Sequence, residues 1–74
     1  MVSLAREVLA NISERGVVHY TVLADMMRIG HYYARLICRL LGRDDYIVID
    51  AVGRCKITPK GKSFLKEEVI SALT

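Results

Sequence analysis

Apolar positions recur along the chain with two different periods, and these periods predict its secondary structure. Residues 4–15 place apolar side chains at helical spacing, with Ser3 and Gly16 suited to cap the two ends. Residues 17–20 are too few for a helix and favour extended backbone, so we expect a short strand there. A second, short helix is expected after Thr21, which is a suitable N-cap.

The middle of the chain predicts a third helix followed by a hairpin. Residues 31–41 form the helical segment, and the following five side chains cluster on one side of it, which we expect to face the core: Tyr33, Ala34, Ile37, Leu40 and Leu41. Residues 46–52 form a short segment rich in β-branched side chains, which Gly53 interrupts. Residues 54–58 form a second extended segment that runs back along the first. This pattern is typical of two antiparallel strands.

Thr58 followed by Pro59 favours the start of a last helix, as an N-cap residue and a proline in the first turn. The apolar side of this helix carries Phe64, Leu65, Val69, Ile70 and Leu73. The predicted order is therefore helix, strand, helix, helix, strand, strand, helix. This is a mainly α fold with a small β-hairpin, of the α+β class, in one domain over residues 1–74.

The composition is typical of a soluble, globular protein. The chain has 74 residues, of which 53% are hydrophobic and 26% charged, which excludes a disordered chain. No apolar run approaches the length of a membrane span, and no secretion signal is present, so we expect a cytoplasmic protein. The apolar share is high for so small a domain, which favours a second copy as a cover for part of it.

The chain lacks Gln and Trp and has a single Asn, which is a weak sign of a thermophilic source. This bears on the two cysteines, because intracellular proteins of hyperthermophiles do form disulfides. Cys38 and Cys55 are therefore either buried free thiols or a disulfide. Two cysteines without further ligands make a poor zinc site.

Positive charge is concentrated in the middle of the chain. Residues 28–62 hold eight Lys or Arg and three Asp, a net charge of +5, whereas the whole chain carries +3. One cationic face on a small domain attracts polyanions, although a solvated charged surface explains the same pattern.

The junction Ile57-Thr58-Pro59-Lys60-Gly61-Lys62-Ser63-Phe64-Leu65 resembles the "LTPKGREFL" junction of small archaeal and bacterial winged helix-turn-helix regulators. The resemblance extends from Val8 to Val69 and is supported by Leu23-Ala24, Ile29, Ala34 and Leu40-Leu41, with Gly53 at the tip of the wing. It implies a DNA-binding domain whose third helix enters the major groove and whose hairpin, residues 46–58, is the wing.

Two positions depart from the family pattern. Arg28 stands where the family usually has a glycine between the two central helices. Left-handed backbone strains an arginine, so we expect a longer second helix or a different turn. Asp45 replaces a second glycine before the first wing strand, and aspartate tolerates left-handed backbone better.

The resemblance implies DNA contacts for basic and aromatic residues of the third helix and the hairpin. Arg35 and Arg39 would enter the major groove, where a guanidinium can bind guanine or a phosphate. The other candidates are His31 and Tyr32 at the start of the helix, Arg28 before it, Arg54 at the hairpin tip and Lys56 along the hairpin. For Arg28, and for Arg43 after the helix, surface charge is an equal alternative. His19 is interpreted as a structural histidine.

An enzyme is not expected, because no nucleophile has a base and no phosphate loop is present. We expect no cofactor, no metal and no small-molecule ligand. The predicted function is sequence-specific binding of double-stranded DNA as a transcriptional regulator, with a homodimer through the first and last helices. A protein–protein interaction module and a sequence-neutral architectural DNA-binding protein are the alternatives.

Overall fold

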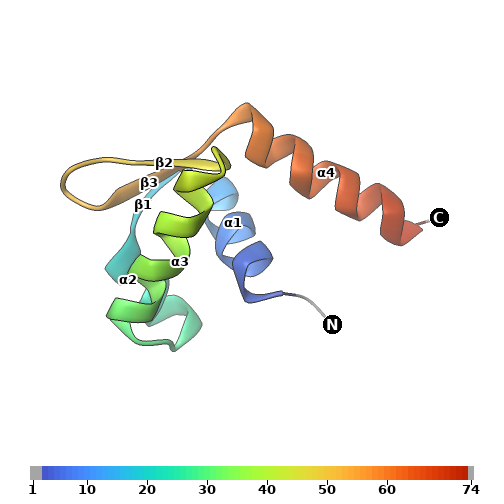
Figure 1. Cartoon of the computed structure of the whole chain (residues 1–74). Helices are drawn as coiled ribbons and strands as arrows, with labels where there is room; N and C mark the ends of the chain where they lie inside the picture. Colours follow the sequence, from blue (N-terminus) through green and yellow to red (C-terminus); the bar gives the residue numbers. More distant parts are fainter. Residues whose placement is uncertain (1–2, 74) are drawn as a thin grey trace.

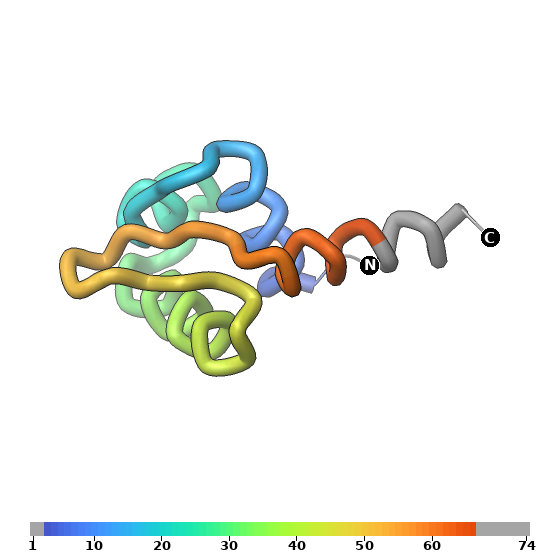
Figure 2. Tube along the Cα trace, turned by 90° about the horizontal axis from the view of Figure 1, so that it is seen from above, coloured from blue at the N-terminus to red at the C-terminus, as the bar shows by residue number. Residues whose placement is uncertain are grey.

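The computed structural model describes the backbone of residues 3–73 and the side chains of residues 3–66. Its elements, in chain order, are α1 (Leu4–Arg15), β1 (Val17–His19), α2 (Tyr20–Met27), α3 (His31–Arg43), β2 (Ile47–Ile49), β3 (Arg54–Ile57) and α4 (Pro59–Leu73). The predicted order and the α+β class are confirmed. Helices α1, α2 and α3 pack together beneath the sheet, and the hairpin turn and the start of α4 lie at opposite ends of it (Figures 1 and 2).

The sheet is antiparallel and has the strand order β1-β3-β2. β3 is central: its Cys55 lies opposite Val18 of β1 on one side and Ile49 of β2 on the other. Burial alternates along β3, so that Cys55 and Ile57 face the helices while Arg54 and Lys56 face outward. The first strand is thus part of the same sheet as the hairpin.

The N-terminal cap of α2 differs from the sequence prediction. Ser3 caps α1 as expected, accepting a hydrogen bond from the Arg6 N–H at 3.1 Å. For α2, however, the cap is His19, whose Nδ1 accepts the Thr21 N–H at 3.2 Å, and Tyr20 is already helical. An imidazole nitrogen thus takes the role expected of the threonine hydroxyl, because β1 ends one residue earlier than predicted.

Each central helix is followed by a non-glycine residue with left-handed backbone. Arg28, at φ 56°, is the C-cap of α2, and Asp45, at φ 65°, comes directly after the C-cap Asp44 of α3. The expectation that Arg28 would force a longer α2 or another turn is wrong. A hydrogen bond from Ile29 N–H to Ala24 O, at 3.0 Å, closes the end of α2 around the strained arginine. The same bond from Tyr46 N–H to Leu41 O, at 3.0 Å, closes α3 two residues later than predicted.

The core is a single cluster in which α1, α2, α3 and the inner face of the sheet meet. From α3 it takes only Ala34, Ile37, Cys38 and Leu41. Two residues expected to face inward are instead exposed, Tyr33 at 49% and Leu40 at 53%. The domain is too small to bury more than a narrow stripe of this helix.

Cys38 of α3 and Cys55 of β3 are fully buried free thiols that hydrogen-bond to each other. This hydrogen bond and burial raise the pKa of the Cys55 thiol. Of the two alternatives for the cysteines, the structure therefore contains the free pair.

The Thr58–Gly61 junction attaches α4 to the end of α3. The Thr58 hydroxyl donates to Asp45 O and accepts the Gly61 N–H at 3.1 Å. Lys60 Nζ donates to Asp44 O at 2.8 Å and lies 4.8 Å from the centre of the Tyr46 ring. Gly61 approaches so closely that an added Cβ would lie 2.2 Å from Tyr46 O. These contacts explain why threonine, lysine and glycine occupy the first, third and fourth positions of the junction.

Candidate nucleic-acid interface

An open trough runs along the outer side of α3, between this helix and the hairpin. One part, of about 510 Å³, is lined by Arg35 and Arg39, by β2 and the hairpin turn, and by Tyr20. A second part, of about 410 Å³, continues past Arg39 to Arg43 and is floored by Ile47–Ile49. Arg39 and Ile49 line both parts. We call this surface the α3–β2 trough.

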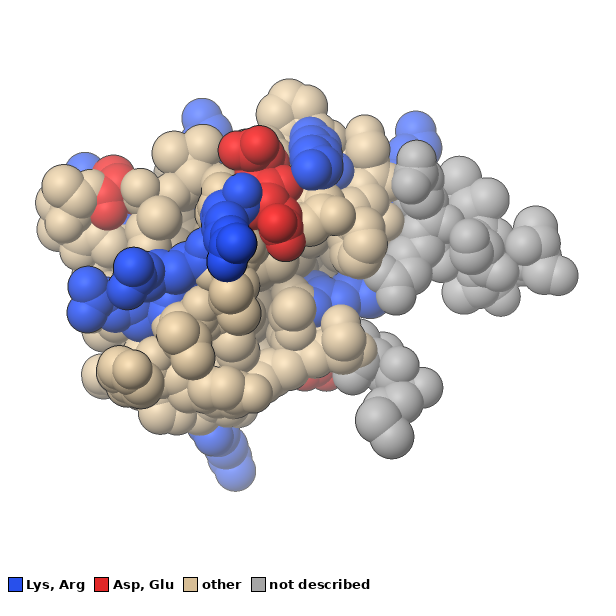
Figure 3. All heavy atoms as spheres, viewed as in Figure 1, with Lys and Arg blue, Asp and Glu red and all other residues tan. Residues whose placement is uncertain are grey.

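Three arginines border the α3–β2 trough at intervals of four residues: Arg35, Arg39 and Arg43. They therefore follow one side of the helix over about 12 Å, at 1.5 Å per residue. All three are exposed, and none has a hydrogen bond or ion pair with the side chains of residues 3–66. In Figure 3 Lys and Arg side chains form a band between the hairpin and α2. Their charge is thus available to a ligand.

The hairpin turn beside the trough has its own acidic residue, Asp50. Its Oδ1 accepts the backbone N–H groups of Val52, Gly53 and Arg54 at 2.9–3.0 Å. The backbone hydrogen bond from Arg54, with those from Val52 and Gly53 and the Arg54 side chain, lowers the pKa of this carboxyl to about 2. Asp50 is therefore ionised at neutral pH.

Arg54 does not lie at the hairpin tip. The turn consists of Asp50, Ala51, Val52 and Gly53, and Arg54 is the first residue of β3. Its Nε donates to Asp50 Oδ2 at 2.8 Å, although both side chains remain exposed. The Asp50 carboxylate partly neutralises the charge of Arg54, which distinguishes it from the arginines of α3.

His19 fixes the hairpin turn to the start of α2. Its Nε2 lies 2.7 Å from Val52 O, and its Nδ1 lies 2.8 Å from Thr21 Oγ1. Because a carbonyl only accepts and the Thr21 N–H only donates, these contacts fit a neutral ring with its proton on Nε2. Gly53 is packed so tightly that an added Cβ would lie 2.7 Å from His19 Nε2. The interpretation of His19 as a structural histidine agrees with these contacts.

The residues at the start of α3 differ in whether their side chains already have a partner within the protein. His31 Nε2 donates to the Asp25 carboxylate of α2 at 2.9 Å, so this ring already has a partner. Tyr32 is 78% exposed, the most exposed of the large apolar side chains within residues 3–66. Arg28 is exposed in the turn before the helix. These three lie at one end of α3, with Arg43 at the other.

Lys56 is separated from the trough. It projects from the outer face of the sheet, where its cross-strand neighbours are Val17 and Val48, 56% and 61% exposed. Cys55 and Ile57, on either side of it, face the core. The structure thus brings Arg35 and Arg39 together in the trough and places Lys56 on a different surface.

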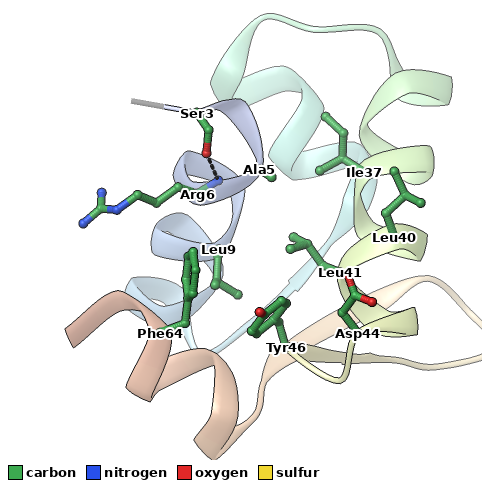
Figure 4. Close-up of a pocket in the computed structure, with 10 residues that line it drawn as sticks. All are labelled: Ser3, Ala5, Arg6, Leu9, Ile37, Leu40, Leu41, Asp44, Tyr46 and Phe64. Carbon is green, nitrogen blue, oxygen red and sulfur yellow. Dashed lines mark hydrogen bonds between the residues drawn. The ribbon is translucent and has the colours of Figure 1, made fainter. Parts of the chain in front are cut away.

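The opposite side of α3 borders an apolar groove of about 290 Å³ (Figure 4). Leu9 of α1, Leu41 of α3 and Phe64 of α4 point into it, together with the Tyr46 ring, which lies 5.1 Å from that of Phe64. Leu40 stands at its rim. Helix α3 therefore separates a basic surface from an apolar one.

Sequence reasoning missed two components of the trough. One is Asp50, although Asp at the first position of a four-residue turn with Gly53 at the fourth is a recognisable signal. The other is Tyr20, which the sequence predicts in the strand. No local signal in the sequence shows that it lines the trough. For Arg43 the sequence favours DNA contact and surface charge equally, but its spacing of four from Arg39 places it in the same row.

The chain matches no protein-family model, and no curated protein matches it. Among the residues that the structure describes, no helix has the length and apolar character needed to cross a membrane. The same residues contain no group of three or more His, Cys, Asp or Glu side chains arranged to hold a metal ion. The geometry of the surfaces is therefore the basis for any functional proposal.

Proposed function

We propose that this protein binds double-stranded DNA sequence-specifically as a winged helix-turn-helix transcriptional regulator in the cytoplasm. In this proposal α3 enters the major groove, and the β2–β3 hairpin is the wing that contacts the flanking duplex. The observation that carries the proposal is the row of exposed arginines Arg35, Arg39 and Arg43, without protein partners among residues 3–66. The fold supports it through the helix pair followed by a hairpin.

The roles proposed for individual residues follow their placement. Arg35 and Arg39 contact base edges or phosphates, and Tyr32 and Arg28 contact the backbone near the start of α3. Arg54 contacts the flank while remaining close to Asp50, so its electrostatic contribution is smaller. His31 and Lys56 are secondary candidates, because His31 is paired with Asp25 and Lys56 lies outside the trough.

Selection from random duplexes with the purified protein tests this proposal. We expect one preferred sequence, whose affinity falls with salt by about 0.9 in log K per log unit for each contacted phosphate. Arg35→Ala should relax the sequence preference, whereas Arg54→Ala should weaken all sequences about equally. Arg15→Ala, an exposed arginine at the end of α1 and next to the opposite sheet edge, is the matched control.

Two results would contradict the proposal in different ways. Equal affinity for all duplexes would favour a sequence-neutral architectural protein. No duplex binding, even at low salt, would favour a protein–protein interaction module, an alternative supported by the apolar groove in Figure 4. Unchanged binding in Arg35→Ala would show that α3 is not the reading element.

We also propose a homodimer, in which the apolar groove between α1, α3 and the start of α4 is covered by the second copy. The groove and the exposed Phe64 support this surface. Of the apolar residues expected on the last helix, Val69, Ile70 and Leu73 lie outside the described side chains. Light scattering at micromolar concentration should give the mass of two chains, and a monomer would exclude this dimer.

A further inference from the structure

The outward face of α3 is not uniformly basic. Beside the arginine row it presents Leu36, which is 42% exposed although it is a large apolar residue. Four other residues, Ala34, Ile37, Cys38 and Leu41, already supply the contact of this helix with the core. Leu36 therefore contributes little to the core and points to the same solvent region as the arginines.

Leu36 lies next to Arg39 and Arg43 rather than apart from them. These three and Leu40 line one shallow depression on the crest of α3. Residues three, four and seven positions apart share one helix face, which puts Leu36 between the arginine row and the exposed Leu40. A ligand seated in this depression contacts Arg39, Arg43 and Leu36 together.

The chemistry of this face identifies what can cover it. Two exposed arginines with no partner among residues 3–66 favour an anionic ligand, and a duplex supplies phosphates at the rims of the major groove. Within that groove the apolar group of the bases is the C5-methyl of thymine, and the other edge atoms are mainly hydrogen-bond donors and acceptors. Leucine cannot form hydrogen bonds, so it leaves those polar groups unsatisfied and packs well only on the methyl group.

We infer that Leu36 is a specificity-determining residue that contacts the C5-methyl group of a thymine when Arg39 and Arg43 hold the duplex. This inference rests on the proposed function and deepens it, because it specifies one base of the site. It also predicts selection of DNA over the same sequence without the thymine methyl groups.

Replacement of thymine by deoxyuridine in the selected duplex tests the inference, because it removes one methyl group and keeps base pairing. Each thymine is replaced in turn, and binding is measured for the wild-type protein, Leu36→Ala and Leu40→Ala. At one position the wild-type protein should lose about fourfold in affinity, the factor expected for one methyl group. In Leu36→Ala the same replacement should change affinity less than twofold.

Leu40→Ala is the matched control, because Leu40 is equally apolar, exposed and on the same helix, but it also borders the apolar groove on the other side of α3. The Leu40→Ala variant should still lose about fourfold in affinity when that thymine is replaced by deoxyuridine. The circular dichroism of both variants should equal that of the wild type, because neither leucine belongs to the core. Leu40 borders the groove proposed for the second copy, so light scattering records whether Leu40→Ala is still a dimer.

Three outcomes would overturn the inference. If no uracil replacement lowers wild-type affinity although the duplex binds tightly, Leu36 reads no methyl group and the proposed function stands. If the wild-type protein binds no duplex, the proposed function itself fails. If Leu36→Ala converts a dimer into monomers, the Leu36 side of α3 contacts protein instead of DNA.

Discussion

The hairpin turn and the outward face of α3 border the same trough but are organised in opposite ways. In the turn, the polar groups bond to each other: Asp50 accepts three backbone N–H groups and one guanidinium N–H, and His19 contacts Val52 O. On α3, the guanidinium groups of Arg35, Arg39 and Arg43 have no partner within residues 3–66.

This difference indicates that the turn contributes mainly to stability and the outward face of α3 mainly to binding. Groups that are satisfied within the protein fix a conformation, and their loss costs stability. Exposed arginines without partners contribute little to folding and remain free for an anionic ligand. The turn therefore determines the position of one wall of the trough, while α3 supplies the charge. Variants of the turn should change folding, and variants of α3 should change binding alone.

Gly53→Ala should cause the largest loss of stability. Gly53 has φ 105°, which strains other residues, and the new Cβ would lie 2.7 Å from both His19 Nε2 and the Tyr20 ring. We expect a decrease of about 3 kcal/mol in the free energy of unfolding, measured by urea denaturation. Arg35→Ala should differ from the wild type by less than about 0.5 kcal/mol. Equal effects of the two variants would contradict the comparison.

His19→Ala should have the second largest effect, about 2 kcal/mol, because it removes the cap of α2 and the hydrogen bond to Val52 O. His31→Ala is the matched control: its ring also contacts a partner, the Asp25 carboxylate, but both are exposed, so the loss should stay below about 0.5 kcal/mol. Thermal denaturation of both variants measures the difference. If His31→Ala proves the more damaging, His19 does not hold the turn.

Arg28→Gly should stabilise the protein. Glycine relieves the left-handed arginine, although it also increases the entropy of the unfolded chain, so a gain of about 0.5–1 kcal/mol remains. Asp45→Gly should gain less, because aspartate tolerates φ 65° better. Chemical denaturation distinguishes the two. A decrease in stability for Arg28→Gly would mean that the arginine side chain contributes to the turn.

Asp50→Asn should show the smallest effect, and mainly a change in pH dependence. The folded pKa of about 2 lies below the ordinary value of 3.8, so the ionised carboxylate stabilises the fold above pH 3.8. This contribution is lost as the pH falls from about 4 to about 2. Melting temperatures across this interval should decline more in the wild type than in Asp50→Asn. Parallel curves would show that the hydrogen bonds to Asp50 do not depend on its charge.

The sequence was sufficient to predict the order of the elements, because helical spacing and β-branched runs are local signals. It was also sufficient to pair Arg35 with Arg39, which a helix places on one face. It failed where tertiary packing decides. Tyr33 and Leu40 are apolar at helical spacing, but the core accepts a narrower stripe of α3.

The backbone at Arg28 could not be predicted from residue preference either. Its strain of about 1–2 kcal/mol is offset by the hydrogen bond that closes α2 and by the packing of Ile29 against the core. Likewise, the separation of Lys56 from the trough depends on the pairing of β3 with both of its neighbours. The role of β1 as the third strand is a long-range feature that no local pattern encodes.

Chemical-shift mapping of the ¹⁵N-labelled protein with the selected duplex tests most directly whether the α3–β2 trough is the DNA-binding surface. We predict that the largest shifts occur at the Nε–H groups of Arg35, Arg39 and Arg43, with smaller shifts at Val52 and Gly53. If the largest shifts instead fall on Val17 and Lys56, or on the groove around Leu9 and Phe64, the duplex binds elsewhere and the account is contradicted.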